Sequence, residues 1–112
     1  MTGPILERDW KYLGSIKDEL LNEPCSRILT KAVKIAAGAE KDRPHQRYLT
    51  LYRYIEKSDS IVEDCFNDWR RSTISNKILS LRHHHLLTDE HVKHMSENAQ
   101  DWLQMLEANL KY

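Results

Sequence analysis

Residues 44–71 read PHQRYLTLYRYIEKSDSIVEDCFNDWRR, and this stretch decides the fold class. At about 100° per residue, its apolar side chains fill an arc of about 180° around a helix, and the charged side chains fill the other half. The phase is kept across residues 58–60, which predicts one helix of about 28 residues and about 40 Å. The pattern Ser60-x-x-Glu63 also matches a capping box, so a break at that point is the alternative. An apolar arc this broad is typical of a helix that packs against several neighbours.

The remainder of the chain shows the same helical period. Residues 6–20 repeat apolar side chains every three or four positions, and Asn22-Glu23-Pro24 is a start signal for a second helix that ends near Gly38. A short helix is expected around residues 74–81, and Thr88 is the expected N-cap of an amphipathic C-terminal helix over about 89–110. Three glycines and three prolines leave little room for the turns of a β fold. We therefore expect an all-α, compact bundle of four to five helices with one long central helix (about 44–71). It should form a single domain over residues 1–112, with residues 1–4 disordered.

Charge and cysteine content argue against several classes of protein. The chain carries 17 basic and 17 acidic residues, so it lacks the basic excess of a dedicated nucleic-acid or membrane-surface binder. Cys25 and Cys65 lie far apart among apolar positions, which favours two reduced and buried thiols. The first residues do not resemble a secretory signal, and no apolar run approaches the roughly 18 residues of a membrane span. Together these features predict a cytoplasmic protein.

Five of the six histidines lie between residues 83 and 94. Helical geometry separates them: His83 and His94 should face solvent, His84 lies on a flank, and His85 and His91 border the core. Imidazole binds metals and changes its charge near neutral pH, so His85 and His91 are the candidate metal ligands of a metal- or pH-responsive protein. The His-Glu-x-x-His and Glu-x-x-His patterns of zinc and di-iron enzymes are absent. Capping and solvation of a helix end is the simpler interpretation, and no cofactor is expected.

Two further functions can be weighed from local patterns. Arg70, Arg71 and Arg82 form the best basic patch and are the candidate residues for weak nucleic-acid binding. The acidic residues near the first pair and the zero net charge favour an ordinary solvated surface instead. The sequence has no Gly-rich phosphate loop and no Gly-x-Ser-x-Gly motif, so we assign no catalytic residue and favour a non-enzymatic protein.

The C-terminal segment offers the strongest sequence argument for an interaction. Its apolar residues keep a three–four repeat, which could pair within the bundle or with the same helix of a second copy. The candidate interaction residues are Trp102, Met105, Leu106 and Leu110. We therefore expect a small, non-catalytic protein–protein interaction or regulatory adaptor domain that self-associates as a homodimer.

Overall fold

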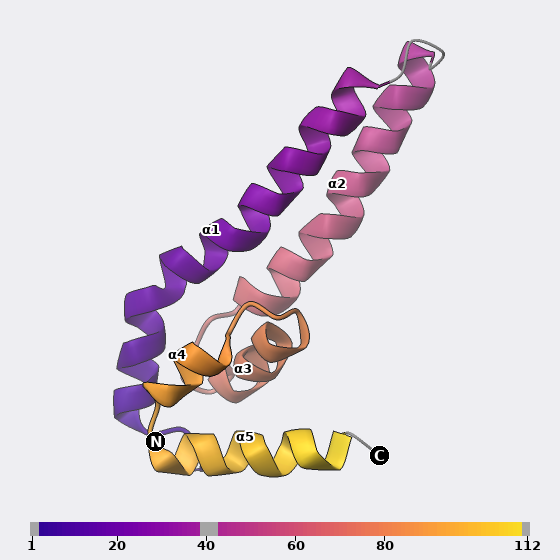
Figure 1. The fold of residues 1–112 in the computed structure, drawn as a ribbon. Coiled ribbons are helices and arrows are strands. Elements are labelled where there is room, and N and C mark those ends of the chain that lie inside the picture. The colour runs from indigo at the N-terminus through magenta and orange to yellow at the C-terminus, as the bar shows by residue number, and fades with distance from the viewer. Residues whose placement is uncertain (1–2, 39–42, 111–112) are drawn as a thin grey trace.

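The computed structural model describes residues 3–38 and 43–110, the side chain of residue 110 excepted. Within these ranges the chain forms five helices: α1 (Glu7–Ala37), α2 (Pro44–Phe66), α3 (Ile74–His83), α4 (Asp89–Lys93) and α5 (Glu97–Leu110). The described residues contain no β-strand (Figure 1), so the expected all-α fold is confirmed. No helix among them combines the length and the apolar character needed to cross a membrane.

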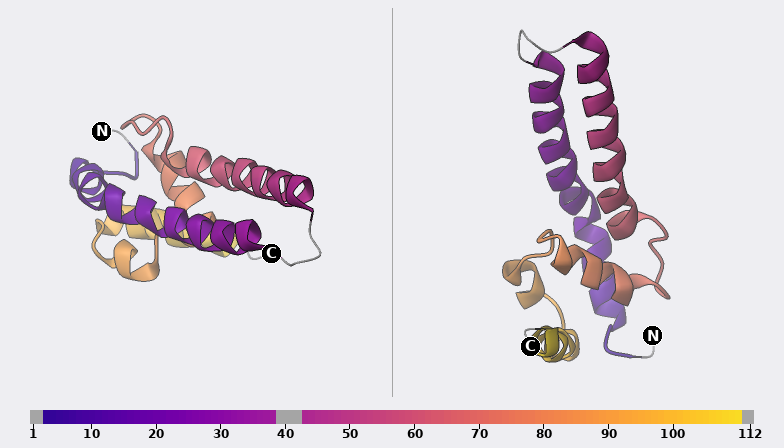
Figure 2. Two further views of the ribbon diagram at one scale, coloured as in Figure 1. Left: turned by 90° about the horizontal axis from the view of Figure 1, so that it is seen from above. Right: turned by 90° about the vertical axis from the view of Figure 1, so that its right-hand side faces the viewer.

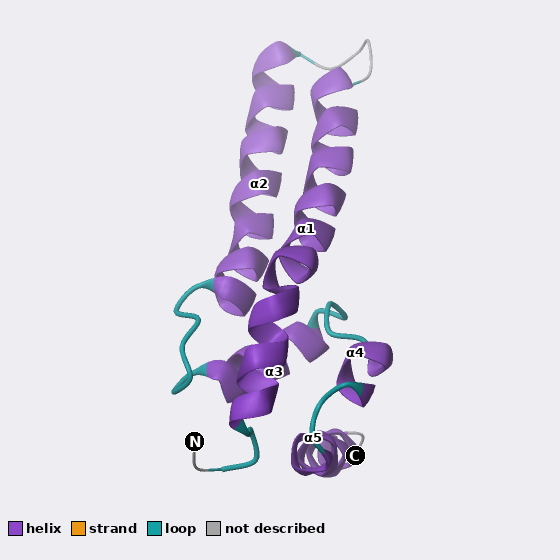
Figure 3. Ribbon diagram, turned by 90° about the vertical axis from the view of Figure 1, so that its left-hand side faces the viewer, coloured by secondary structure: helices purple, strands orange, loops and turns teal. Residues whose placement is uncertain are grey.

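The molecule has two parts, which we call the arm and the body. The arm is the antiparallel pair formed by residues 21–37 of α1 and residues 44–62 of α2. It extends away from α3, α4 and α5 (Figure 2), and at its base Leu21, Ile61 and Val62 pack against the core. The body contains the first part of α1, the end of α2 and the three shorter helices. Helix α5 lies at its far end, where it is seen lengthwise in Figure 1 and end-on in Figure 3. The molecule measures 55 × 32 × 22 Å and its radius of gyration is 17.5 Å. A compact domain of this length would have a radius of gyration of about 13 Å, so the bundle is elongated.

Helix α1 is continuous where the sequence predicted a new helix start. The prediction that a second helix starts at Asn22-Glu23-Pro24 is wrong, because α1 runs through Pro24 without interruption. Proline has no backbone N–H and its ring disfavours the preceding turn, which bends helices rather than always ending them. The ribbon of α1 bends where the arm meets the body (Figure 1). Burial of Pro24 and of Leu20, one turn earlier, supplies the packing that keeps the helix intact.

Helix α2 is a single helix across residues 58–60, as its unbroken phase predicted. The Ser60 hydroxyl donates backwards to the Lys57 carbonyl at 2.6 Å, so it does not cap a new helix. The expected end near residue 71 is wrong, since α2 stops at Phe66. Asp68 adopts a positive φ of 57°, a left-handed conformation that cannot continue a right-handed helix.

The expected C-terminal helix over 89–110 is divided into α4 and α5. Asp9, a fully buried carboxylate on α1, accepts from the Ser96 backbone N–H at 2.7 Å and from the Ser96 hydroxyl at 2.6 Å. Ser96 Oγ in turn accepts from the backbone N–H of Ala99 at 3.2 Å, which is the geometry of a helix N-cap. A contact between residues 87 positions apart therefore fixes where α5 begins. Thr88 caps α4 as expected, and its hydroxyl accepts from the His91 backbone N–H.

The core lies in the body and draws on all its long elements. Its members include Leu13 and Leu20 from α1, Cys65 and Phe66 from α2, Ile74, Ile78 and Leu81 from α3, and Met95, Ala99 and Leu103 from the C-terminal segment. Cys65 is buried and Cys25 half-buried, and both are free thiols. The expectation that residues 1–4 are disordered falls partly outside the described residues. The described residue Pro4 is half-buried, and it leads directly into Ile5, which is buried.

Candidate functional site

The arm exposes an apolar strip that the sequence pattern placed in the core. The strip consists of five large side chains with exposed fractions of 45–69%: Leu29 and Val33 on α1, and Tyr48, Tyr52 and Ile55 on α2. The three α2 residues belong to the broad apolar arc of residues 44–71, which we expected to face several neighbours. In the arm α2 has only α1 beside it (Figure 1), so part of the arc stays in contact with solvent.

The two halves of the apolar strip lie on the same side of the arm. Leu29 follows the half-buried Ile28 by one residue, and Tyr52 follows the half-buried Leu51 by one residue. Ile28 and Leu51 face the neighbouring helix of the arm. The side chains of Leu29 and Tyr52 therefore point about 100° away from that helix. Because α2 runs opposite to α1 and lies across from it, both rotations lead to the same side of the pair.

The opposite side of the arm is charged. Arg27, Lys31 and Lys34 recur at three- or four-residue spacing on α1, away from the apolar strip. The Lys31 ammonium group lies 5.0 Å from the centre of the Tyr54 ring, which joins this side of α1 to the matching side of α2. The arm therefore has one apolar and one polar side, like an amphipathic element whose second partner is missing.

Charge also changes along the length of the arm. Its tip, where α1 ends and α2 begins, carries Arg27, Lys31 and Lys34 on α1 and Arg47 and Arg53 on α2; residues 24–37 and 43–55 contain no acidic residue. Its base carries Glu56 and Asp59 on α2, together with Lys57, and Glu63 and Asp64 follow where α2 enters the body. A helix N-terminus favours acidic side chains, yet the first turn of α2 has none. The helix dipole therefore does not account for this gradient on α2.

The histidines are divided by the end of α3. His83 is exposed, as expected, but the inward orientation expected for His85 is wrong: it is exposed and has a positive φ of 59°. The reason is that α3 ends at His83, so the helical phase does not extend to residue 85. His91 Nδ1 contacts the backbone nitrogen and the hydroxyl of Thr88 at 3.0 Å, which engages this ring in capping α4. His94 is exposed, and no group of metal-type ligands among the described residues includes His85 or His91.

The three candidate nucleic-acid arginines are each paired with carboxylates. Arg70 contacts Asp68 at 2.6 Å, and these hydrogen bonds hold the pKa of the Asp68 carboxyl below its ordinary value. Arg71 contacts Glu7 at 2.6 Å. Arg82 is the most enclosed of the three, with a side chain only 20% exposed. Because their charges are neutralised locally, the three arginines do not form a free phosphate-binding patch.

Arg82 instead joins α3 to the C-terminal helices. Its guanidinium contacts Glu107 at 2.7 Å and Asp89 at 2.9 Å, and it donates to the Leu87 carbonyl at 2.9 Å. The hydrogen bonds that Arg82 donates to Glu107 are the main reason that the pKa of Arg82 is raised. This arginine is a structural link within the body.

The candidate interaction residues of the C-terminal helix have mixed environments. Trp102 and Leu106 are half-buried, and Leu106 lines a groove of about 660 Å³ beside the end of α3. Met105 is 57% exposed. The side chain of Leu110 lies outside the described residues. On α5, Met105 is therefore the one large exposed apolar side chain among those described, whereas the arm carries five together.

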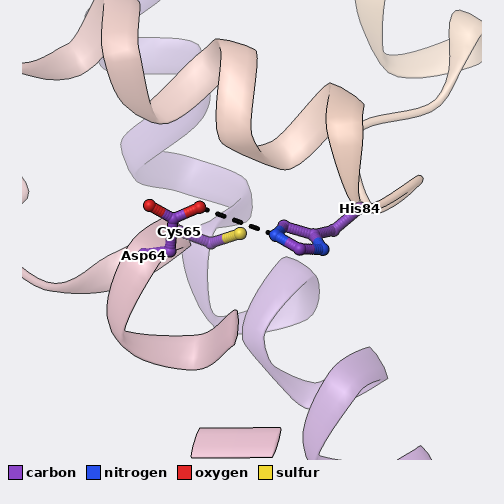
Figure 4. Close-up of side chains that lie close together, drawn as sticks. All are labelled: Asp64, Cys65 and His84. Carbon is purple, nitrogen blue, oxygen red and sulfur yellow. Dashed lines mark ion pairs between the residues drawn. The ribbon is translucent and has the colours of Figure 1, made fainter. Parts of the chain in front are cut away.

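A second cluster brings together side chains that are distant in sequence. Asp64 and Cys65, at the end of α2, meet His84, the residue that caps α3, and their ligand atoms all lie within 4.8 Å of one another (Figure 4). The His84 Nε2 atom lies 3.5 Å from the nearer Asp64 carboxylate oxygen. Burial raises the pKa of the Cys65 thiol to about 11, and the neighbouring Asp64 charge adds to the effect. The thiol is therefore protonated at neutral pH and fully enclosed, which argues against a nucleophilic role.

This cluster was missed from the sequence. Its two parts are separated by 19 positions and match no ligand motif, so only the packing of α3 on α2 reveals them. The comparisons with known proteins add no assignment: no family model, curated protein or solved structure matches this chain.

Proposed function

We propose that this chain is a non-catalytic interaction protein that associates with itself through the arm. The observation that carries the proposal is the apolar strip of Leu29, Val33, Tyr48, Tyr52 and Ile55, whose exposed fractions are 45–69%. Large apolar side chains gathered on one side of an element mark an interaction surface more often than scattered ones. Burial of such surface yields roughly 25 cal/mol per Å², so covering five large side chains supplies a substantial driving force.

A second copy of the arm is the occupant that fits this surface. Two helical pairs that cover each other's apolar sides form a four-helix bundle, in which every helix has two neighbours. In a two-fold arrangement the same patch serves both partners, so no further apolar surface is needed. The zero net charge of the chain also means that two copies meet without overall repulsion.

The charge gradient sets the orientation of the two arms. With the copies antiparallel, the basic tip of each arm lies beside the acidic base of the other. With the copies parallel, tip would meet tip and like charges would oppose each other. Most of the tip cations lie on the polar side of the arm, so they act on the second copy through the field of the whole arm, which contributes little to affinity and favours one arrangement over the other. The proposed assembly is therefore antiparallel.

The mass of the protein in solution tests the proposal. Light scattering coupled to gel filtration should give a dimer for the native chain at micromolar concentration. Leu29→Glu and Tyr52→Glu, each placing a charge in the apolar strip, should give monomers with unchanged helix content by circular dichroism. Met105→Glu is the matched control, since it changes an equally exposed apolar residue on α5, and it should remain dimeric.

Disulfide cross-linking of introduced cysteines tests the orientation. Tyr48 lies near the tip, and Ile55 lies seven residues further along α2, about 10 Å away at 1.5 Å per residue; both are exposed on the apolar strip. With the copies antiparallel, a mixture of Tyr48→Cys and Ile55→Cys chains, each also carrying Cys25→Ser, should form disulfide-linked dimers on mild oxidation. A disulfide between two Tyr48→Cys chains would instead indicate a parallel dimer.

Two outcomes would overturn the proposal. A monomeric native chain at all accessible concentrations would show that the arm does not self-associate. A dimer that survives both strip substitutions but is lost in Met105→Glu would place the interface on α5.

A further inference from the structure

The cluster of Asp64, Cys65 and His84 has the composition of a transition-metal site. It offers one sulfur, one imidazole nitrogen and one carboxylate oxygen, all within 4.8 Å of one another. Figure 4 shows the Cys65 sulfur directed toward the His84 ring, with the Asp64 carboxylate beside them. The three side chains come from two different helix ends, so they converge without belonging to one local motif.

The spacing matches what a tetrahedral ion requires. Zinc bonds to nitrogen and oxygen ligands are about 2.0–2.1 Å long, which places two tetrahedral ligand atoms roughly 3.4 Å apart. The His84 nitrogen and the Asp64 oxygen are 3.5 Å apart. The Asp64 and His84 side chains are 56% and 24% exposed, so both have room to adjust around an ion.

The donor set selects the metal. Thiolate and imidazole are poor ligands for magnesium and calcium, which prefer oxygen, and are good ligands for zinc. Three protein ligands leave the fourth position for water, and the exposed Asp64 side chain faces the solvent from which that water would come. The Lys77 ammonium group donates to the Asp64 backbone carbonyl at 2.9 Å and not to the Asp64 carboxylate.

We infer that Asp64, Cys65 and His84 bind one Zn²⁺ ion at the junction of α2 and α3. On binding, the Cys65 S–H bond breaks, a Zn–S bond forms, and the proton passes to the buffer. Binding therefore weakens as the pH falls. The ion would join the end of α2 to the end of α3 within the body, and so it would stabilise the body against unfolding. This inference is independent of the self-association proposed above.

Cobalt substitution tests the site, because tetrahedral Co²⁺ bound to a thiolate absorbs in the near ultraviolet and in the visible. The chain, produced without a histidine tag and stripped with chelator, should bind one equivalent of Co²⁺ with both bands, and Zn²⁺ should displace it. Cys65→Ser should abolish the sulfur charge-transfer band, and His84→Gln and Asp64→Asn should each weaken binding by about tenfold or more.

His83→Gln and His91→Gln are the matched controls, since both residues lie in the same histidine-rich region but outside the cluster, and both should bind Co²⁺ as the native chain does. Should Cys65→Ser fail to fold, the two variants at exposed or half-buried positions, Asp64→Asn and His84→Gln, still decide the result. The inference is overturned by absence of binding, by binding without a sulfur band, or by a loss of binding confined to the His83 and His91 variants.

Discussion

The body and the arm of this protein are built from the same two long helices, yet they differ in how their apolar faces are covered. In the body, α1 and α2 are joined by α3, α4 and α5, and residues such as Leu13 and Cys65 are fully buried. In the arm the two helices have only each other, and Leu29 and Tyr52 remain more than half exposed. The number of neighbours, not the apolar pattern of a helix, therefore decides how much of its surface is buried.

The largest expected effect comes from a core residue of the body. Leu81→Ala should lower the free energy of unfolding by about 2–5 kcal/mol, because it leaves a cavity among fully buried side chains. Leu29→Ala, the same change in the arm, should cost under about 1 kcal/mol when measured on monomeric protein. Urea denaturation of both variants makes the comparison, and equal losses would show that the arm is as well covered as the body.

The Asp9 carboxylate should have the next largest effect. It is fully buried and accepts from the Leu6 and Ser96 backbone N–H groups and from the Ser96 hydroxyl. Asp9→Asn replaces one acceptor oxygen with a donor, so we expect a loss of about 2–3 kcal/mol in the free energy of unfolding. Asp18→Asn, an exposed change on the same helix, is the control and should be nearly neutral. If Asp9→Asn left the free energy of unfolding unchanged, this would contradict the role of the carboxylate in fixing where α5 begins.

The Arg82 network should have an intermediate effect. Arg82→Ala removes contacts to Glu107, Asp89 and the Leu87 carbonyl, and we expect a loss of roughly 1–3 kcal/mol by denaturation. Arg70→Ala removes an exposed pair with Asp68 and should have a much smaller effect on stability. If Arg82→Ala instead left stability unchanged, the pairing that argues against phosphate binding by Arg82 would lose its support.

The smallest expected effect is a difference in the chemical reactivity of the two thiols. Their labelling compares the arm with the body and requires no substitution. Cys25 lies in the arm and is half-buried, whereas Cys65 lies in the body, is enclosed and has a thiol pKa raised to about 11. At pH 8 in the absence of metal, a thiol reagent should modify Cys25 readily and Cys65 only at the rate of unfolding. Mass spectrometry of the labelled peptides distinguishes them.

The same raised pKa predicts how stability depends on pH. The pKa of the thiol is about 9.0 in the unfolded chain, its ordinary value, and about 11 in the folded protein, so the folded state holds the proton more tightly between these two pH values. The contribution of the Cys65 thiol to the free energy of unfolding is therefore fully present below about pH 9, and it is lost as the pH rises toward 11. Cys65→Ser should lack this component, and equal pH profiles for the two proteins would contradict it.

Local sequence patterns predicted the presence of the helices better than the residues at which they begin and end. The unbroken phase over residues 58–60 correctly predicted one helix, and Thr88 was correctly predicted as an N-cap. The start signal at Pro24 failed because burial of that residue in a packed helix outweighed its local preference. For the candidate site, the pattern identified Tyr48, Tyr52 and Ile55 as apolar but placed them in the core. It could not show their exposure, because exposure depends on which helices lie beside them.

The sequence by itself determined that this protein is all-α, where most of its helices lie and which side of each is apolar, because helical period and capping residues act over only a few positions. Tertiary structure decided the rest. It set the start of α5 through Asp9 and Ser96, paired Arg82 with Glu107, brought His84 to Asp64 and Cys65, and left one side of the arm uncovered. Each of these features depends on side chains that meet only after the chain has folded, and no pattern of neighbouring residues encodes such a meeting.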